Sequence, residues 1–218
     1  MYNVELLSKT KHKESTYNDS LSLFKDIKVI TLGLNEIKKL SCILPVVISG
    51  GEEQRFVVVT GLRENYFLSN RCKDIYIPAS IKTYPFVMVN AKSNDKDVRA
   101  IAIDKDALNG ENKIYDENGN FTQKTNSKIE LLKKFDLDVL KSKSLINDLK
   151  NWGLLEKSNI ELKTDKETKR ILSDFFVVNR KKLYSLEENK FNKLARSGVL
   201  SILESHIDSI SNIKNLIF

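Results

Sequence analysis

The spacing of apolar residues changes once along this chain of 218 residues, and this change constrains the fold more than any other feature. Up to about residue 122, apolar residues occur in short β-branched runs that end at turn residues, a pattern typical of successive strands. After Thr125 they recur at three- and four-residue steps, as on one face of a helix. Because strands come first and helices later, the order favours an α+β fold over an alternating α/β fold.

The first part of the chain is predicted to form antiparallel hairpins. Residues 44–49 and 54–60 flank Gly50-Gly51, and glycine supplies the backbone freedom that a tight hairpin turn needs. Residues 86–89 and 99–103 flank a polar loop at 94–97. Further elements are predicted in this part: strands at 27–32, 66–68 and 75–77, a short helix to Leu40 capped by Asn35, a helical turn at 78–82 and a tight turn at Asn118-Gly119.

The last part of the chain is predicted to hold helices and one further strand pair. An apolar stripe from Leu132 to Leu149 predicts one amphipathic helix or two in series. Thr125 or Ser127 could cap its start, and Gly153 stands where a residue with positive φ ends a helix. The further elements are strands at 160–163 and 171–178 and helices at 187–197 and 199–217, with Gly198 between the two helices.

Composition divides the chain into three parts that we expect to fold as one integrated domain. Residues 1–20 are polar and lack periodicity, which indicates a polar tail or a loosely packed strand. Residues 21–122 form the β-rich part, and residues 123–218 form the helical part with its strand pair near 160–178. A chain of this length can bury a sufficient core without disulfides or metals.

The formal net charge is +7, and nearly all of the positive charge is lysine. Arginine is the residue favoured for bidentate contacts to phosphates and bases, so this composition disfavours nucleic-acid binding. The basic runs at 9–13, 133–134 and 180–182 are short and mixed with polar residues, which predicts solvated surfaces rather than a binding patch. An anionic surface, such as lipid headgroups or polysaccharide, stays open as a partner.

The sequence predicts no membrane span and no secretory signal. No stretch approaches the roughly 18 apolar residues of a membrane-spanning helix. The first residues lack the apolar region and the small-residue cleavage site of a signal peptide. We therefore expect a cytoplasmic protein. Export without an N-terminal signal is the alternative, in which the last helix would act as the export signal.

No arrangement of residues predicts a catalytic residue, a metal site or a cofactor. The glycine motifs that bind phosphates are absent. The only histidines are His12, in the polar first segment, and His206, which borders the apolar stripe of the last helix and is predicted to be a satisfied helix histidine. Asp104, Asp106 and Asn109 do not have the spacing of a calcium loop, and we expect a polar loop there.

The two cysteines do not predict a metal site either. Cys42 and Cys72 lie too far apart for a zinc knuckle, and there is no second pair. Cys42 lies within the apolar stretch 40–44, which predicts a small buried side chain. A disulfide between the two has no support in a chain expected to be cytoplasmic.

Five segments occur in an order and spacing that resemble a known family. They are residues 44–47, 61–65, 77–86, 101–104 and 176–179. The third contains Pro-Ala, then a basic residue and Tyr-Pro-Phe, and the fourth reads as a strand that ends in an acid. Together with the apolar spacing of the closing helices, this order resembles the SapC family from about residue 27 to the C-terminus.

The resemblance implies a link to bacterial surface-layer proteins, because the family name refers to surface-array genes, and it implies no reaction. It therefore favours a non-enzymatic accessory or interaction protein, with a surface-layer protein or secretion components as partners. One alternative is a small-molecule-binding protein or an enzyme of unknown reaction. The other alternative is a secreted surface component.

Aromatic residues gather in the β-rich part, where they could line a ligand groove or fill a sheet core. The candidate binding residues are Arg63, Tyr84, Phe86 and Asp104. Pro85 fixes its own φ and favours an extended Tyr84, so the segment is also interpreted as a rigid corner that enters the core. We favour the corner over the binding surface.

Overall fold

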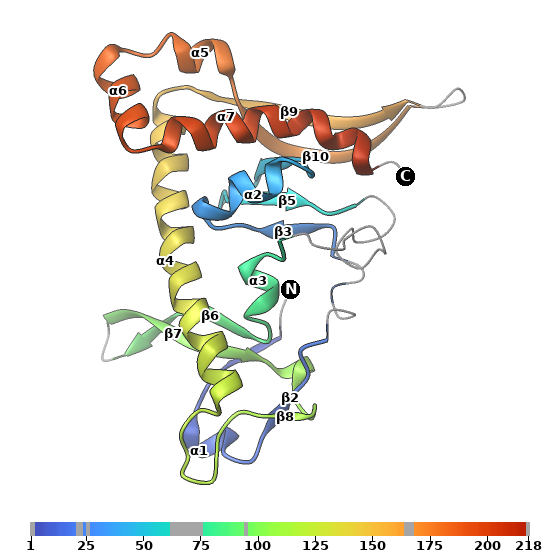
Figure 1. Cartoon of the computed structure of the whole chain (residues 1–218), viewed down its shortest axis with the longest axis vertical. Helices are drawn as coiled ribbons and strands as arrows, with labels where there is room; N and C mark the ends of the chain where they lie inside the picture. The colour runs from blue at the N-terminus through green and yellow to red at the C-terminus, as the bar shows by residue number, and fades with distance from the viewer. Residues whose placement is uncertain are drawn as a thin grey trace. The chain divides into compact units, whose positions relative to one another are not determined.

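The computed structural model of the chain describes residues 3–20, 24, 27–61, 76–93, 96–163 and 168–216, with the backbone alone for 160–163 and 168–173. Contacts divide the chain into two compact units, each built from two separate stretches. Unit 1 comprises Met1–Lys25 and Ala79–Leu137, and unit 2 comprises Asp26–Pro78 and Asp138–Phe218. Both contain antiparallel strands together with helices, which confirms the predicted α+β class (Figure 1).

Unit 1 is built around a small antiparallel sheet and the first part of a long helix. Its elements are β1 (Val4–Leu6), α1 (Lys9–His12), β2 (Thr16–Tyr17), α3 (Ala79–Lys82), β6 (Phe86–Ser93), β7 (Lys96–Asp104), η4 (Lys105–Ala107), β8 (Asn112–Lys113) and the beginning of α4 (Gln123–Asn151). The sheet has the order β1-β7-β6, and β2 pairs with β8 separately. The predicted hairpin of β6 and β7 is confirmed, with Phe86 opposite Ile103.

The core of unit 1 includes residues from the N-terminal segment. Tyr17 is fully buried and contacts the ring of Phe86 edge to face, with 5.1 Å between the ring centroids. β1 pairs with β7, and the side chain of His12 is buried beside Glu5. Residues 4–17 are therefore not a polar tail. Their strands are only two or three residues long, which is too short for a periodic pattern to be visible.

Unit 2 is built around a five-stranded antiparallel sheet. Its elements are β3 (Val29–Thr31), η2 (Leu34–Glu36), α2 (Ile37–Ser41), β4 (Val46–Ser49), β5 (Phe56–Val59), the end of α4, β9 (Leu155–Lys163), β10 (Thr168–Val178), α5 (Arg180–Tyr184), α6 (Glu188–Arg196), α7 (Val199–Ser209) and η5 (Ile210–Leu216). The strand order is β3-β5-β4-β10-β9. Both predicted strand pairs are confirmed, and the pairing of Phe176 with Ile48 joins them in one sheet.

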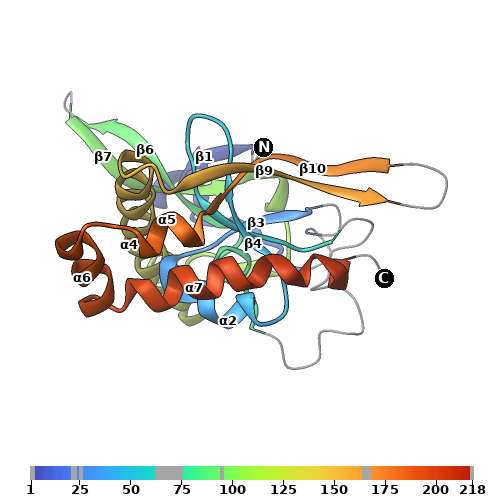
Figure 2. The ribbon, with the colours of Figure 1, turned by 90° about the horizontal axis from the view of Figure 1, so that it is seen from above.

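Helices α2 and α7 of unit 2 lie side by side and pack against β4 and β10 (Figures 1 and 2). The predicted break between α6 and α7 is confirmed at Gly198, whose φ is 74°. Helix α4 is a single helix, and Gly153 with φ 68° follows its end as predicted. Its capping residue differs from the predicted Thr125 or Ser127. The side chain of Thr122 accepts a hydrogen bond from the backbone N–H of Thr125 (3.3 Å) and caps the start of the helix.

Four local predictions need correction or lie outside the described residues. Asn35 does not cap the short helix, because its amide donates to Asp138 (2.7 Å) while Glu36 accepts from the backbone N–H of Gly33. The predicted strand at 66–68 lies outside the described residues, and Tyr76 and Ile77 are not in a strand. Lys96 and Asp97, predicted to be loop residues, belong to β7.

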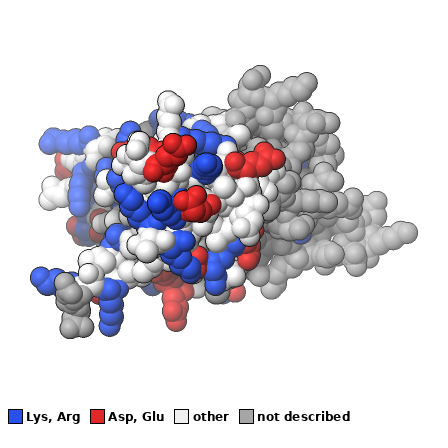
Figure 3. Space-filling view, turned by 90° about the horizontal axis from the view of Figure 1, so that it is seen from below, with Lys and Arg blue, Asp and Glu red and all other residues white. Residues whose placement is uncertain are grey.

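On the face that Figure 3 shows, Lys and Arg side chains are interspersed with Asp and Glu rather than gathered in one patch. Among the helices of the described residues, none is both long enough and apolar enough to cross a bilayer. The long helix α4 carries charged residues throughout its length.

Candidate ligand-binding site

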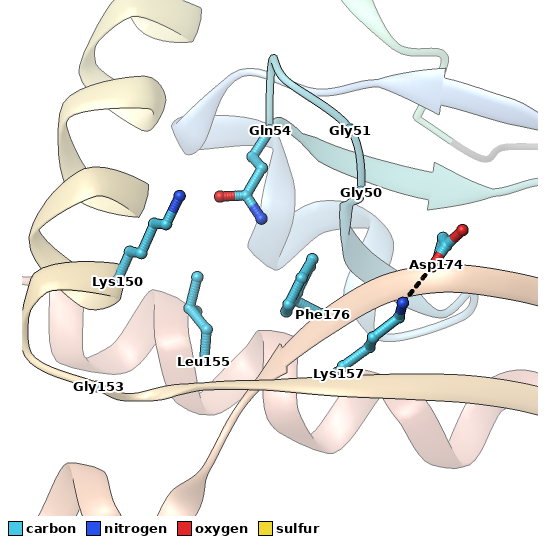
Figure 4. A pocket seen from close by; sticks show the side chains of 9 residues that line it. All are labelled: Gly50, Gly51, Gln54, Lys150, Gly153, Leu155, Lys157, Asp174 and Phe176. Carbon is cyan, nitrogen blue, oxygen red and sulfur yellow. Dashed lines mark ion pairs between the residues drawn. The ribbon is translucent and has the colours of Figure 1, made fainter.

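A pocket of about 410 Å³ opens in unit 2, where the β4–β5 hairpin, the end of α4 and strands β9 and β10 meet (Figure 4). Its size is within the range of small-molecule sites. The residues that line it come from three stretches of the sequence, 50–54, 150–157 and 174–176.

The hairpin wall depends on Gly50 and Gly51. A Cβ atom on Gly50 would lie 2.2 Å from the backbone oxygen of Asp174, so only glycine permits β10 to approach the turn this closely. Gly51 has φ 85°, a left-handed conformation that is costly for other residues. Ser49 accepts a hydrogen bond from the backbone N–H of Arg55 (3.0 Å), which closes the loop.

Strand β10 is irregular where it borders the pocket. Asp174 has φ 57°, which is uncommon outside glycine, and the pairing with β9 shifts register between Leu172 and Phe175. The carboxylate of Asp174 forms an ion pair with the ammonium of Lys157 (2.5 Å), and both side chains are largely exposed. Exposed ion pairs contribute little to stability. The main effect of this contact is therefore to orient the Lys157 ammonium toward the Asp174 carboxylate.

Two polar side chains at the pocket have no partner of their own among the described residues. Lys150 stands in the last turn of α4 and makes neither a hydrogen bond nor an ion pair with them. The amide of Gln54 likewise makes no hydrogen bond with them. Figure 4 shows both side chains directed into the same space. The carbonyl ends of a helix stabilise a cation in its last turn, so this position suits a charged lysine.

The floor of the pocket is apolar. Leu155 on β9 and Phe176 on β10 are both partly exposed, and their side chains rise toward the space between Lys150 and Gln54 (Figure 4). A cation and an amide above an apolar floor can hold a ligand that has an acceptor group at one end and an apolar body. No cluster of His, Cys, Asp or Glu among the described residues could hold a metal ion.

Three of the four predicted binding residues lie elsewhere, in unit 1. The hydroxyl of Tyr84 donates to the carboxylate of Asp104 (3.2 Å), and Phe86 begins the strand beside them. Tyr84 is 5% exposed, Asp104 4% and Phe86 0%, so they form part of the core rather than an open groove. Arg63 lies outside the described residues. Ligand binding by these residues stays a prediction.

Lys128 on α4 holds the corner that contains Tyr84. Its ammonium donates to the backbone oxygens of Lys82 (2.7 Å) and Tyr84 (2.9 Å) and pairs with Asp19 (3.2 Å). Burial lowers the pKa of Lys128, and the bond to Asp19 offsets part of that effect. The lysine thus satisfies carbonyls at the end of α3, which supports the interpretation of this segment as a rigid corner.

The aromatic residues predicted to gather in the β-rich part are Tyr66, Phe67, Tyr76, Tyr84 and Phe86, and the described ones are divided between the two units. Tyr76 belongs to unit 2, where its hydroxyl donates to Glu36 (2.9 Å) and the ammonium of Lys39 lies 4.3 Å from the ring centroid. Burial and the neighbouring Glu36 raise the pKa of Tyr76 to about 12. Tyr66 and Phe67 lie outside the described residues.

The predictions for Cys42 and His206 also need correction. Cys42 is exposed: it follows α2 as the C-cap residue, whereas Ile37 and Leu40 within the helix are buried. His206 is fully buried as a helix residue, and its Nε2 accepts from the backbone N–H of Val178 (3.2 Å). Its Nδ1 has no hydrogen-bond partner among the described residues, so the ring is only half satisfied.

A second pocket, of about 390 Å³, lies in unit 1 and is lined partly by the stacked rings of Tyr115 and Phe121. Arg99 at this pocket makes a two-pronged ion pair with Asp136. Lys133, also at the pocket, pairs with a glutamate on its own helix. Because both cations already have anionic partners, the pocket in unit 2 is the better candidate site for an anionic ligand.

A comparison with protein-family models finds a match that covers nearly the whole chain. The SapC family model matches residues 7–216 of the 218. The chain belongs to the SapC family. No curated protein and no solved structure matches it. The match confirms the resemblance and extends it to the N-terminal segment that contains α1 and β2.

Four of the five segments that carry the SapC resemblance hold structural positions, and residues 62–65 of the other segment lie outside the described residues. Residues 44–47 lead into the central strand β4, and residues 176–179 end β10 beside it. Residues 79–86 form α3 and the corner at the cis Tyr84–Pro85 bond, and Asp104 ends β7. The pocket of unit 2 was missed by sequence reasoning, because neither Lys150 nor Gln54 stands in a motif.

We expect Tyr84→Phe to lower the free energy of unfolding by about 1–2 kcal/mol, because it removes the only described hydroxyl that donates to the buried carboxylate of Asp104. Chemical denaturation of the purified protein measures this loss. The control is Tyr115→Phe, since the Tyr115 hydroxyl makes no hydrogen bond with described residues. Equal effects of the two substitutions would show that the Tyr84–Asp104 bond adds nothing.

Proposed function

We propose that this SapC-family chain is a non-enzymatic accessory protein that supports the production or export of a bacterial surface-layer protein. The observation that carries the proposal is the family match over residues 7–216, nearly the whole chain. The family name links its members to surface-array genes. In this role the chain would contact either the surface-layer protein itself or a component of its export apparatus.

Affinity capture after crosslinking in the native host tests this role. A tagged chain is expected to recover a surface-layer subunit or an exporter component, and cells without crosslinker serve as the control for chance adsorption. Deleting the gene is expected to lower the amount of surface-layer protein outside the cell several-fold. Recovery of neither partner, together with unchanged surface-layer protein in the deletion strain, would refute the role.

As part of this proposal we place the chain in the cytoplasm, where it would act before export. Fractionation of whole cells checks the location without altering the protein. A chain found mainly in the surface fraction would favour the alternative of a secreted surface component. Deletion of the last helix is unsuitable here, because α7 carries buried residues that include Leu203 and His206.

The pocket of unit 2 favours a second candidate function, a small-molecule-binding protein. Its size, its cation without a partner among the described residues and its apolar floor are the features of a binding site. The two functions are compatible, because a bound ligand could control an accessory protein.

A further inference from the structure

We propose that the pocket of unit 2 binds a small monocarboxylate with an apolar body. The carboxylate would accept hydrogen bonds from Lys150 and Gln54, and the apolar body would lie on Leu155 and Phe176. The site goes beyond the proposed role in surface-layer production and does not depend on it. A purified chain can therefore test the site whatever the outcome of the capture experiment.

The charged side chains at the pocket favour a ligand that carries a single negative charge. Its ionisable side chains are Lys150, Lys157 and Asp174, which sum to +1 when all are ionised. Lys157 is already paired with Asp174 at 2.5 Å, so the ammonium of Lys150 is the one left to meet a ligand. A dianion such as phosphate would leave a net negative charge at the site. A carboxylate neutralises the site and matches the donors of an ammonium and an amide.

The apolar floor favours a ligand whose remaining part is apolar. Leu155 and Phe176 are partly exposed although they lie on a sheet, and covering them would remove apolar surface from water. Their side chains rise toward the space into which Lys150 and Gln54 point (Figure 4). A volume of about 410 Å³ admits a ligand with an aromatic ring or a short alkyl chain.

The backbone holds the pocket open independently of a ligand. Gly50 abuts the backbone of Asp174, and the β4–β5 turn is further closed by the bond between Ser49 and Arg55. Helix α4 ends beside the pocket, and Gly153 reverses the chain into β9. The site is therefore largely formed before binding, which reduces the entropy cost of binding.

Phenylacetate, titrated near pH 7 where its carboxyl is ionised, is the probe. Binding is followed by the amide signals of Gly50, Gly51 and Gly153, which are readily separated because the chain has only 8 glycines. The fluorescence of Trp152, the only tryptophan, gives a second readout beside Gly153. We expect saturable shifts at these glycines and at least tenfold weaker binding of the neutral isostere phenylacetamide.

Lys150→Met is expected to weaken phenylacetate binding at least tenfold, while Lys141→Met, on an exposed position of the same helix, leaves it unchanged. Matching circular dichroism and melting temperatures show that both variants fold. The proposal is overturned if about 20 mM phenylacetate shifts none of these signals, a limit that already corresponds to very weak binding. Equal binding of phenylacetamide, or equal loss in both variants, would also overturn it, as would phosphate binding as tightly as phenylacetate.

Discussion

Gly50→Ala is expected to lower the free energy of unfolding by about 3 kcal/mol, near the upper end for an inserted methyl group. The new Cβ atom would lie 2.2 Å from the backbone oxygen of Asp174 and 3.1 Å from its carbonyl carbon. These are backbone atoms of a paired strand, so relief requires β10 or the β4–β5 turn to move rather than a side chain to rotate. Denaturant unfolding of the purified protein measures the loss.

Gly51→Ala is the matched control, because it adds the same methyl group one residue away. Nothing lies within 4 Å of its Cβ, and only its φ of 85° is unfavourable for alanine. We expect a loss of about 1 kcal/mol from that conformation. If the two substitutions cost the same, the close approach of Gly50 to Asp174 does not exist in solution. The wall of the candidate pocket would then need a different description.

Acidification is expected to destabilise the chain through His206. Burial lowers the pKa of this histidine to about 4 from its ordinary 6.5, so its ring is neutral in the folded chain. The unfolded chain binds the proton at the higher pKa, and stability is therefore lost as pH falls from about 6.5 to about 4. At about 1.4 kcal/mol per pH unit, this window amounts to a loss of about 3 kcal/mol.

The packing around His206 explains why protonation is unfavourable there. The ring is 0% exposed and lies edge to face against Phe56, with 5.5 Å between the ring centroids. Its Nε2 accepts from the backbone of Val178, which requires that nitrogen to be unprotonated. The backbone of Val46 favours the charged ring and offsets part of the burial effect, although no hydrogen bond of ordinary geometry joins it to Nδ1.

The comparison of His206→Gln with the unaltered chain isolates this effect. Glutamine can accept from the Val178 N–H but does not titrate, so the difference in unfolding free energy between the two proteins should fall by about 3 kcal/mol from pH 7 to pH 4. His12→Gln, which leaves His206 in place, should retain the acid loss. Parallel pH profiles for the unaltered chain and His206→Gln would contradict the assignment.

Local signals in the sequence were sufficient for most of the secondary structure. The Gly50-Gly51 hairpin, the β6–β7 pair and the helix ends at Gly153 and Gly198 all follow from short-range preferences of the backbone. The SapC resemblance also rested on short segments, and the family match confirms it. These features depend on residues that are neighbours in the chain, so a single sequence contains the information they need.

The candidate site in unit 2 could not be predicted from local signals in the sequence. Its wall at Gly50 and its floor at Phe176 meet only because β10 pairs with β4, and hydrophobic patterning does not state which distant strand a given strand joins. The exposure of Cys42 and the burial of His12 were misjudged for a related reason. A residue's neighbours in sequence do not reveal which face of its element meets the core.

The amino-acid sequence by itself determined the α+β class, the family and most strands and helices, because each is encoded in local periodicity, turn residues or short motifs. Tertiary structure alone decided that the two strand pairs form one sheet, that Tyr84 and Asp104 bond within the core, and that Lys150 faces an apolar floor. The physical reason is that these contacts join segments many residues apart, and burial of apolar surface over the whole chain selects among the pairings that local preferences permit.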